Sequence, residues 1–161
     1  MADPNATLMA DVTPANFEIG SAMVAFDSVK LGGTDGPPTL SVEPVIREAK
    51  CDQNGDNVVA IYITGYNIKL KAKFKEITKA LAVLMPANKL SADDFGVDQI
   101  ATNGKSLAVV GLKRSFTLPK ALPSGNWEYA IAGTEEHGIE IEFSAYQAAN
   151  GDYLTHVVAG A

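Results

Sequence analysis

The sequence predicts a mainly β protein, an antiparallel β-sandwich or barrel with one short flanking α-helix. About eight stretches alternate apolar and polar residues or are rich in β-branched residues, as strands are. Short turns rich in glycine, proline and asparagine separate them, and only one segment has a clear helical period. Because strands and helices do not alternate along the chain, a parallel sheet is not expected.

The length and composition predict one domain. The chain has 161 residues, of which 47% are hydrophobic and 20% charged, so it can bury a substantial core. Residues 1–15 are small and polar and predict a flexible N-terminal arm. Plain terminal disorder and an arm that orders on a neighbouring subunit both explain this composition. Residues 16–161 are expected to form the single β-rich domain.

The first half of the chain predicts a long hairpin. Residues 40–49 have a strand pattern, and Asn54-Gly55 predicts the turn because both residues tolerate a positive φ. The returning strand is expected to bulge or bend at Gly65 and to continue to Lys75.

Further strands follow the same patterns. They are expected at residues 21–26, 106–112, 114–118, 127–132, 138–146 and 153–158. Turns between the later strands are predicted at Pro119 and Pro123, and Asn150-Gly151 is the second clear hairpin turn.

One segment changes to a helical period at Glu76 and ends before Pro86. A helix this short is not stable alone, so its apolar face is expected to pack on the outer side of the sheet. The side chains of that face are Ile77, Leu81 and Leu84, with Ala80 beside them. Ser91 and Asp94 have the spacing of a second helix start.

No motif predicts catalysis, a metal site or a cofactor. The Gly-x-Ser-x-Gly elbow and the phosphate-binding glycine motifs are absent. Residues 52–56 have the oxygen spacing that begins a calcium loop, but the glycine and glutamate required later in that motif are missing. Cys51, His137 and His156 have no paired zinc-ligand spacing. The sequence therefore predicts a protein that is not an enzyme.

The most unusual pattern is a strand with lysine at every second position. In residues 68–75 the lysines project from one face and the apolar residues from the other. They are Lys69, Lys71, Lys73 and Lys75. Like charges on one face repel, so this face needs solvent, opposing carboxylates or a polyanion.

We expect charge compensation of these lysines, and a water-exposed exterior face is the alternative. The candidate partners on other predicted strands are Glu43, Glu48, Glu140 and Glu142. The last two could also form a glycosidase pair. They alternate with apolar residues, however, as the outward face of a half-buried strand does.

The net charge and the N-terminal sequence exclude several classes of function. A net charge of -6 and a pI of about 4.8 argue against an ordinary DNA-binding surface, but suit one that DNA passes without sticking. The single cysteine, Cys51, cannot form an internal disulfide, and no signal peptide is expected. No apolar run approaches the ~20 residues that cross a bilayer. We therefore expect synthesis in a reducing cytoplasm and no membrane insertion.

The order of features over residues 20–85 resembles the tail tube proteins of long-tailed bacteriophages, and the tubes of contractile injection and secretion systems are similar. The motifs that carry the resemblance are a strand near Phe26 leading to Leu31-Gly32-Gly33-Thr34, the turn Asp52-Gln53-Asn54-Gly55, Ile63-Thr64-Gly65-Tyr66, and the strand-to-helix transition Phe74-Lys75-Glu76-Ile77-Thr78.

The resemblance implies a structural subunit that forms stacked hexameric rings. The sheets of one ring would join into a β-barrel around a channel for double-stranded DNA during ejection. The implied partners are further copies of the chain, the tape-measure protein and DNA in the lumen without tight binding, and a sheath. The protein would belong to the virion tail, after synthesis in the cytoplasm of the bacterial host.

The arm and one loop are expected to make contacts between stacked rings, because neither can build a core. The loop consists of Gly32, Gly33, Thr34, Asp35, Gly36, Pro37 and Pro38. The alternatives are another virion or secretion-system tube, a tail terminator, and a β-sandwich binding module. A binding module would present two or three exposed aromatic residues on one face.

Overall fold

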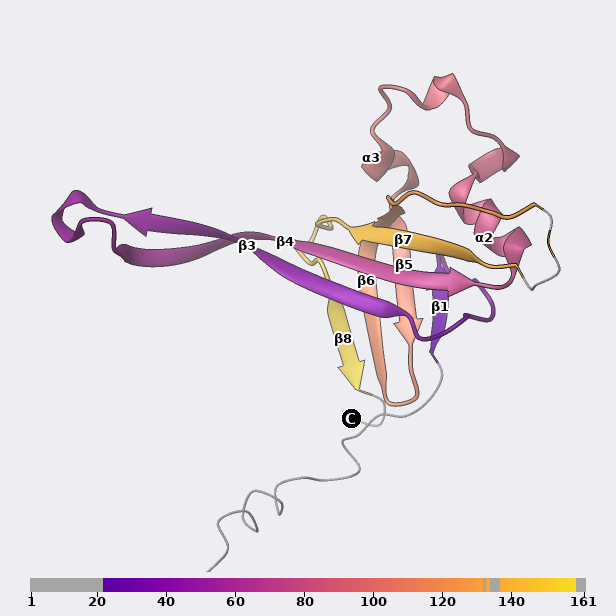
Figure 1. Ribbon diagram of the computed structural model, residues 1–161, viewed down its shortest axis with the longest axis horizontal. Coiled ribbons are helices and arrows are strands. Elements are labelled where there is room, and N and C mark those ends of the chain that lie inside the picture. The colour runs from indigo at the N-terminus through magenta and orange to yellow at the C-terminus, as the bar shows by residue number, and fades with distance from the viewer. Residues whose placement is uncertain (1–21, 132, 134–136, 159–161) are drawn as a thin grey trace, which may run out of the picture.

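The computed structural model describes residues 22–131, 133 and 137–158. They form an eight-stranded sheet in which all pairs are antiparallel, with short helices along one side (Figure 1). The strands are β1 (Met23–Phe26), β2 (Val29–Lys30), β3 (Thr39–Lys50), β4 (Val58–Phe74), β5 (Lys105–Val110), β6 (Arg114–Pro123), β7 (Ile139–Ala145) and β8 (Thr155–Val158). The helices are α2 (Ile77–Leu84) and α3 (Gln99–Asn103), with 3₁₀ turns at Asp52–Asn54, Pro86–Asn88 and Ala92–Asp94.

The predicted class, mainly antiparallel β with a short flanking helix, is confirmed, and the sheet is not closed into a barrel. Its strand order is β2-β1-β5-β6-β7-β4-β3, with β8 also beside β6. The predicted arm, residues 1–15, lies outside the described residues.

The sheet divides into two leaves at β6. One end of β6 pairs with β7 and the other end with β8, while β5 lies along its opposite edge. In Figure 1 the leaf of β3, β4 and β7 runs across the picture, and the leaf of β1, β5, β6 and β8 runs down it. The two leaves therefore cross and enclose a core between their inner faces.

Alternating side chains build this core. Along β7 the apolar positions are buried and the polar positions between them are not, as expected for a half-buried strand. Phe74 and Phe143 are fully buried, and α2 adds Ala80. The predicted helix face packs against the same core through half-buried side chains, namely Ile77, Leu81 and Leu84.

The strand predicted at residues 127–132 is wrong for its described part, because residues 127–131 pair with no strand. Trp127 and Tyr129 pack against the core, and Glu128 between them is exposed. Burial thus alternates as in a strand. Both edges of β7 are already occupied, by β4 and β6, so the segment covers the core without joining the sheet.

Two turn predictions are also corrected. β6 continues through Pro119, opposite a register shift between Lys105 and Leu107. A bulge accommodates proline because no ladder hydrogen bond is lost there. Asn150-Gly151 forms a local turn and not a hairpin, because the strand that follows it, β8, pairs with β6 and not with β7.

The long hairpin of β3 and β4 contains the predicted bulge. Val45 pairs with Gly65 and Ile46 with Ile63, which leaves Thr64 as the extra residue. The Thr64 hydroxyl donates a hydrogen bond to the Val45 carbonyl at 3.2 Å. Gly65 is therefore placed where its lack of a side chain eases the bend.

Candidate assembly surfaces

Among the described residues, no helix or further strand covers the outer half of the β3–β4 hairpin. β7 pairs with β4 only from Ile68 to Phe74. Beyond that point residues 42–50 and 58–66, called the distal hairpin, project from the body of the molecule (Figure 1). A two-stranded ribbon is at best marginally stable alone in water. The distal hairpin is therefore a strong candidate for a surface that a partner completes.

The apolar face of the sheet continues along the distal hairpin. Alternation places Val42 and Ile46 on the same face of β3 as Leu40, which packs against the core. On the hairpin these positions are exposed: Val42 by 48%, Ile46 by 53% and Ile61 by 62%. We call the exposed set on this face the apolar stripe; it consists of Val42, Ile46, Ile61, Ile63 and Tyr66.

The bulge at Thr64 keeps the isoleucines of the apolar stripe on the same face of β4 as its core residues. After the bulge, toward Phe74, the core face of β4 carries even-numbered residues such as Ile68; before the bulge, odd-numbered residues, Ile61 and Ile63, form the same face. One extra residue shifts the two-residue period of a strand by one position. Without the bulge, the row of isoleucines would lie on the lysine side of the hairpin.

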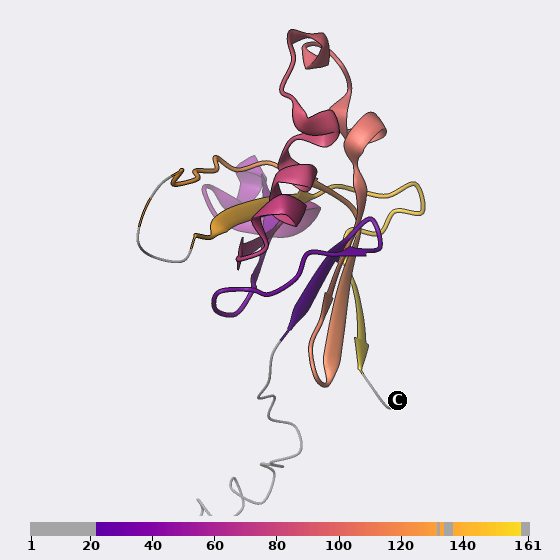
Figure 2. The same ribbon diagram turned by 90° about the vertical axis from the view of Figure 1, so that its right-hand side faces the viewer.

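A second exposed apolar group lies on the other leaf. Met23 pairs with Val110, and Ser115 pairs with both Val110 and Val157, so these side chains share one face. Val157 is 61% exposed. Figure 2 shows the start of β1, the β5–β6 turn and the end of β8 together at one end of the molecule. We call Met23, Val110 and Val157 the end patch.

Two of the four lysines meet the predicted glutamates of β7. The Lys69 Nζ lies 3.0 Å from a carboxylate oxygen of Glu142, and Lys71 lies 3.6 Å from Glu142 and 3.7 Å from Glu140. The hydrogen bond donated by Lys69 holds the pKa of Glu142 below its ordinary value. All four side chains are on the face opposite the core.

Lys73 meets a carboxylate that sequence reasoning missed, Asp35, at 3.1 Å. The loop of Asp35 runs back along the end of β4. The Asp35 amide donates to the Lys73 carbonyl at 2.8 Å, and the Lys75 amide donates to the Gly33 carbonyl at 3.0 Å. The hydrogen bond from Lys73 lowers the pKa of Asp35. No sequence pattern indicated this contact, since it depends on how the loop folds back.

The remaining predicted partners lie elsewhere in the register. Glu43 is opposite Asn67, and Glu48 is opposite Ile61 on the distal hairpin. By alternation, Glu48 shares the face of the apolar stripe and not the face of the lysines. Within one subunit it is therefore the two glutamates of β7 that lie directly across from lysines of β4.

The loop begins with a glycine that the structure requires. Gly32 has a φ of 85°, and a Cβ atom at this position would meet the carboxylate of Glu76. Glu76 in turn accepts a hydrogen bond from Lys79 at 2.6 Å, which lowers its pKa. This packing joins the first loop residues to the start of α2 and gives the loop a defined position.

The described residues contain neither a metal-binding cluster nor a membrane-spanning helix. In that part of the chain no group of three or more His, Cys, Asp or Glu side chains is placed to hold a metal ion. Over the same residues, no helix combines the length and the apolar character needed to span a membrane.

Comparison with known proteins finds solved structures of similar fold but no related sequence. No protein-family model matches the chain, and no curated protein matches it significantly. Among solved structures the chain is similar to one in the cryo-EM structure of the anti-feeding prophage (AFP) baseplate, 6-fold symmetrised. The TM-score is 0.49 with 12% sequence identity, covering 93% of this chain and 99% of that chain. A likeness of this size carries no argument about function, which must be inferred from the chain's own surfaces.

Proposed function

We propose that the chain is the structural subunit of a phage tail tube, in which stacked hexameric rings surround a channel for double-stranded DNA. The observation that carries this proposal is the apolar stripe. It extends the core face of the sheet well beyond the core of one subunit. Patches of this kind mark protein interaction sites. A neighbouring subunit would cover the stripe and supply the missing layer.

The chain itself offers a surface to meet the stripe. The end patch is apolar and lies on the other leaf, so a contact between stripe and end patch joins different surfaces of two copies. Such a heterologous contact repeats from copy to copy and closes into a ring when the rotation permits. Ring closure would also protect the outer edge of β3, which is the last strand of the sheet.

The charges suit a conduit. Lys69, Lys71 and Lys73 each lie within 3.7 Å of a carboxylate, so their face is compensated and would hold DNA weakly. The net charge of -6 acts in the same direction. The resemblance over residues 20–85 implies the other parts of the proposal. These are six subunits per ring, the tape-measure protein and a sheath as partners, and a location in the virion tail.

Contacts between rings fall to the arm of residues 1–15 and to the loop of residues 32–38. The ties of Gly33 and Asp35 to β4 hold that loop in a fixed position, which favours it as a contact element. The same surfaces would serve another virion or secretion-system tube or a tail terminator.

One observation favours a different class, a β-sandwich module that binds carbohydrate. A hollow of about 530 Å³ at the base of the hairpin is lined by Tyr66, Tyr146 and Tyr153 together with polar side chains. The rings of Tyr66 and Tyr153 meet edge to face with centroids 5.9 Å apart. Sugar sites combine aromatic faces with convergent polar groups in this way.

Negative-stain microscopy of the purified protein separates these functions. A tube subunit forms rings or tubes, and Ile63→Asp in the stripe or Val157→Asp in the end patch abolishes them while the subunit stays folded. Leu90→Asp is the matched control, because Leu90 is 68% exposed and belongs to neither surface. Wild-type protein that stays monomeric at high concentration and binds glycans would overturn the tube and support the binding module.

A further inference from the structure

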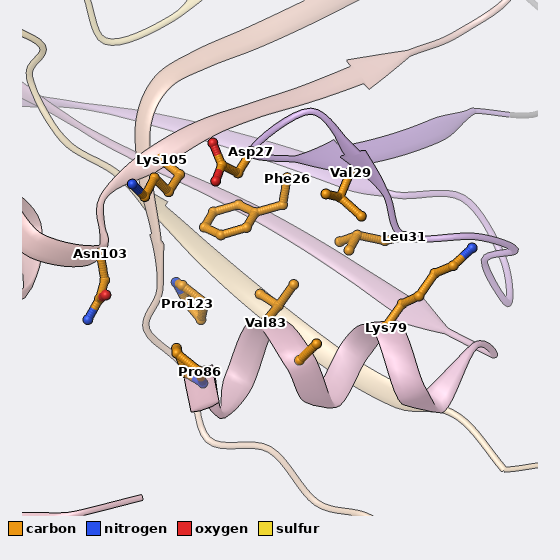
Figure 3. A pocket seen from close by; sticks show the side chains of 11 residues that line it. Phe26, Asp27, Val29, Leu31, Lys79, Val83, Pro86, Asn103, Lys105 and Pro123 are labelled. Atoms are coloured by element: carbon orange, nitrogen blue, oxygen red, sulfur yellow. The ribbon is translucent and has the colours of Figure 1, made fainter. Parts of the chain in front are cut away.

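An apolar cavity lies between α2, the β1–β2 turn and the end of β6. Its volume is about 320 Å³. Figure 3 shows Phe26, Leu31 and Val83 around the space between the turn and the helix. Lys79, Lys105 and Asp27 are the charged residues of its lining, and Lys79 is paired with Glu76. None of the surfaces described above uses this cavity.

Residues with left-handed backbone conformation border the cavity. Within the described residues, the non-glycine positions with positive φ are Asp27 at 51°, Ser28 at 65°, Ala87 at 59° and Asn88 at 57°. Asp27 lines the cavity, and Ala87-Asn88 directly follow Pro86, which also lines it. L-residues adopt this conformation mainly in tight turns. Asp27 and Ser28 are the two central residues of the β1–β2 hairpin, and a two-residue turn of this kind requires a positive φ at both. The evidence for a binding site is therefore the apolar lining of the cavity.

We infer that the cavity is a socket for the segment Phe17-Glu18-Ile19 of a second copy of the chain. The inference rests on the proposed self-assembly. In an extended segment Phe17 and Ile19 point to one side and Glu18 to the other. An apolar cavity of ~150 Å³ already accommodates benzene. The larger volume here suits an aromatic ring together with a branched side chain.

Charge supports the same occupant. Residues 1–20 contain Asp3, Asp11 and Glu18 and neither lysine nor arginine. With both apolar side chains in the socket, Glu18 would face outward to the rim, where Lys105 is exposed.

The segment comes from a neighbour because its own chain approaches the wrong end of β1. The chain enters β1 at Met23, whereas the cavity lies at the Phe26 end. At this end of β1, Ala25 and Phe26 are paired on both edges, by β2 and β5, so a returning segment cannot add beside β1 there. A segment from the next copy reaches the socket from outside without this reversal.

Cysteine cross-linking of the full-length chain tests the inference. In a Cys51→Ser background, one preparation carries Phe17→Cys and the other Ala82→Cys, since Ala82 lines the cavity. The two are mixed under assembly conditions with oxidised glutathione. The expected product is a disulfide-linked pair of the two variants. Its yield should exceed several-fold that with Thr78→Cys, an exposed position on α2 outside the cavity.

A chain with both cysteines distinguishes the source of the segment. Links between chains support the inference, and a link only within one chain overturns it. Yields equal to the Thr78→Cys control overturn it as well. If rings still form in that case, the socket is wrong but the proposed tube stands; if wild type forms no rings, the tube itself fails.

A charge exchange gives a second readout. Glu18→Lys should raise the protein concentration needed for assembly several-fold, and adding Lys105→Glu in the same chain should restore it. Asp11→Lys is the matched control, because it makes the same charge change outside the docking segment. Equal effects of Glu18→Lys and Asp11→Lys, or no restoration by Lys105→Glu, would overturn the pairing with the rim.

Discussion

The ammonium nitrogen of Lys69 lies 3.0 Å from a carboxylate oxygen of Glu142, and this pair joins β4 to β7 across 73 positions of sequence. Lys71 reaches the second oxygen of the same carboxylate at 3.6 Å. Glu142 is thus shared by two cations on the solvent-facing side of the sheet, while Ile141 and Phe143 beside it are buried.

This relationship predicts a pH-dependent stability. The pKa of Glu142 is lowered in the fold from the ordinary 4.5, mainly by the hydrogen bond from Lys69. Its ionisation therefore stabilises the fold above pH 4.5, and this contribution is lost as the pH falls through the folded value. Glu142→Gln should lower the thermal midpoint slightly at pH 7, since exposed pairs contribute little, and the difference from wild type should shrink below pH 4.5.

Thermal melts of the two proteins between pH 7 and pH 3 check this. Glu128→Gln is the control, because Glu128 is exposed on the segment that covers the core and lies outside the lysine face. A deficit of Glu142→Gln that stayed constant across the pH range would contradict the ionic explanation.

Two glycines with the same φ allow backbone strain and steric overlap to be separated. Gly32 and Gly36 both have φ of 85°, but only at Gly32 would a Cβ meet the Glu76 carboxylate. Gly36→Ala should cost about 1–2 kcal/mol, the usual penalty for an L-residue in the left-handed region. Gly32→Ala should cost more. Denaturant unfolding measures both changes.

The side chain of Glu76 provides the check on this comparison. Combining Gly32→Ala with Glu76→Ala should bring the cost down toward that of Gly36→Ala, because the group in the way is removed. If Gly32→Ala and Gly36→Ala lower the free energy of unfolding equally, the structure around Gly32 makes room for the new Cβ without further cost.

The local features of this fold could be predicted, and the long-range ones could not. Alternation in β7, the bulge beside Gly65 and the end of the helix at Pro86 depend on near neighbours, and the structure has each of them. The pairing of β8 with β6 and the contact of Lys73 with Asp35 depend on how distant segments meet.

The strand prediction at residues 127–132 was wrong for the same reason, because strand pairing depends on distant segments. Burial of Trp127 and Tyr129 gives the strand period, but whether a partner edge is free is decided by β4 and β6. The exposed stripe was missed because a run of isoleucine and valine looks the same in a core strand and in an unpartnered one. The two cases differ in the partner strand, because β7 ends at Ala145, opposite Ile68, and does not pair with the part of β4 that carries the stripe.

The helix face predicted from sequence gives a graded test of packing. Leu81 packs against the core but is half-buried, whereas Phe143 is fully buried. Leu81→Ala should therefore lower the free energy of unfolding by about 2 kcal/mol, the low end for leucine, and Phe143→Ala by about 3–5 kcal/mol. Chemical denaturation ranks the two. A larger loss at Leu81 would show that α2 contributes more to the core than its exposure indicates.

The compensated lysine face predicts how assembled rings treat DNA. Replacing Glu140 and Glu142 with glutamine leaves Lys69 and Lys71 without their β7 partners. Each ring would then present these cations once per subunit. Affinity for DNA rises steeply with the number of phosphates neutralised, and its logarithm falls with that of the salt concentration with a slope of about −0.9 per phosphate.

Assembled wild type should therefore hold double-stranded DNA weakly at low salt, and the double variant should hold it more tightly with a steeper salt dependence. Fluorescence anisotropy with labelled DNA at several salt concentrations measures both quantities, and electron microscopy confirms that the rings are unchanged. Glu128→Gln combined with Asp93→Asn is the matched control, because it removes two negative charges at exposed positions outside the lysine face and the apolar stripe. If both double variants gain affinity equally, the gain reflects net charge alone. If neither gains, DNA does not reach the lysine face, which then lies in water on the exterior of the assembly.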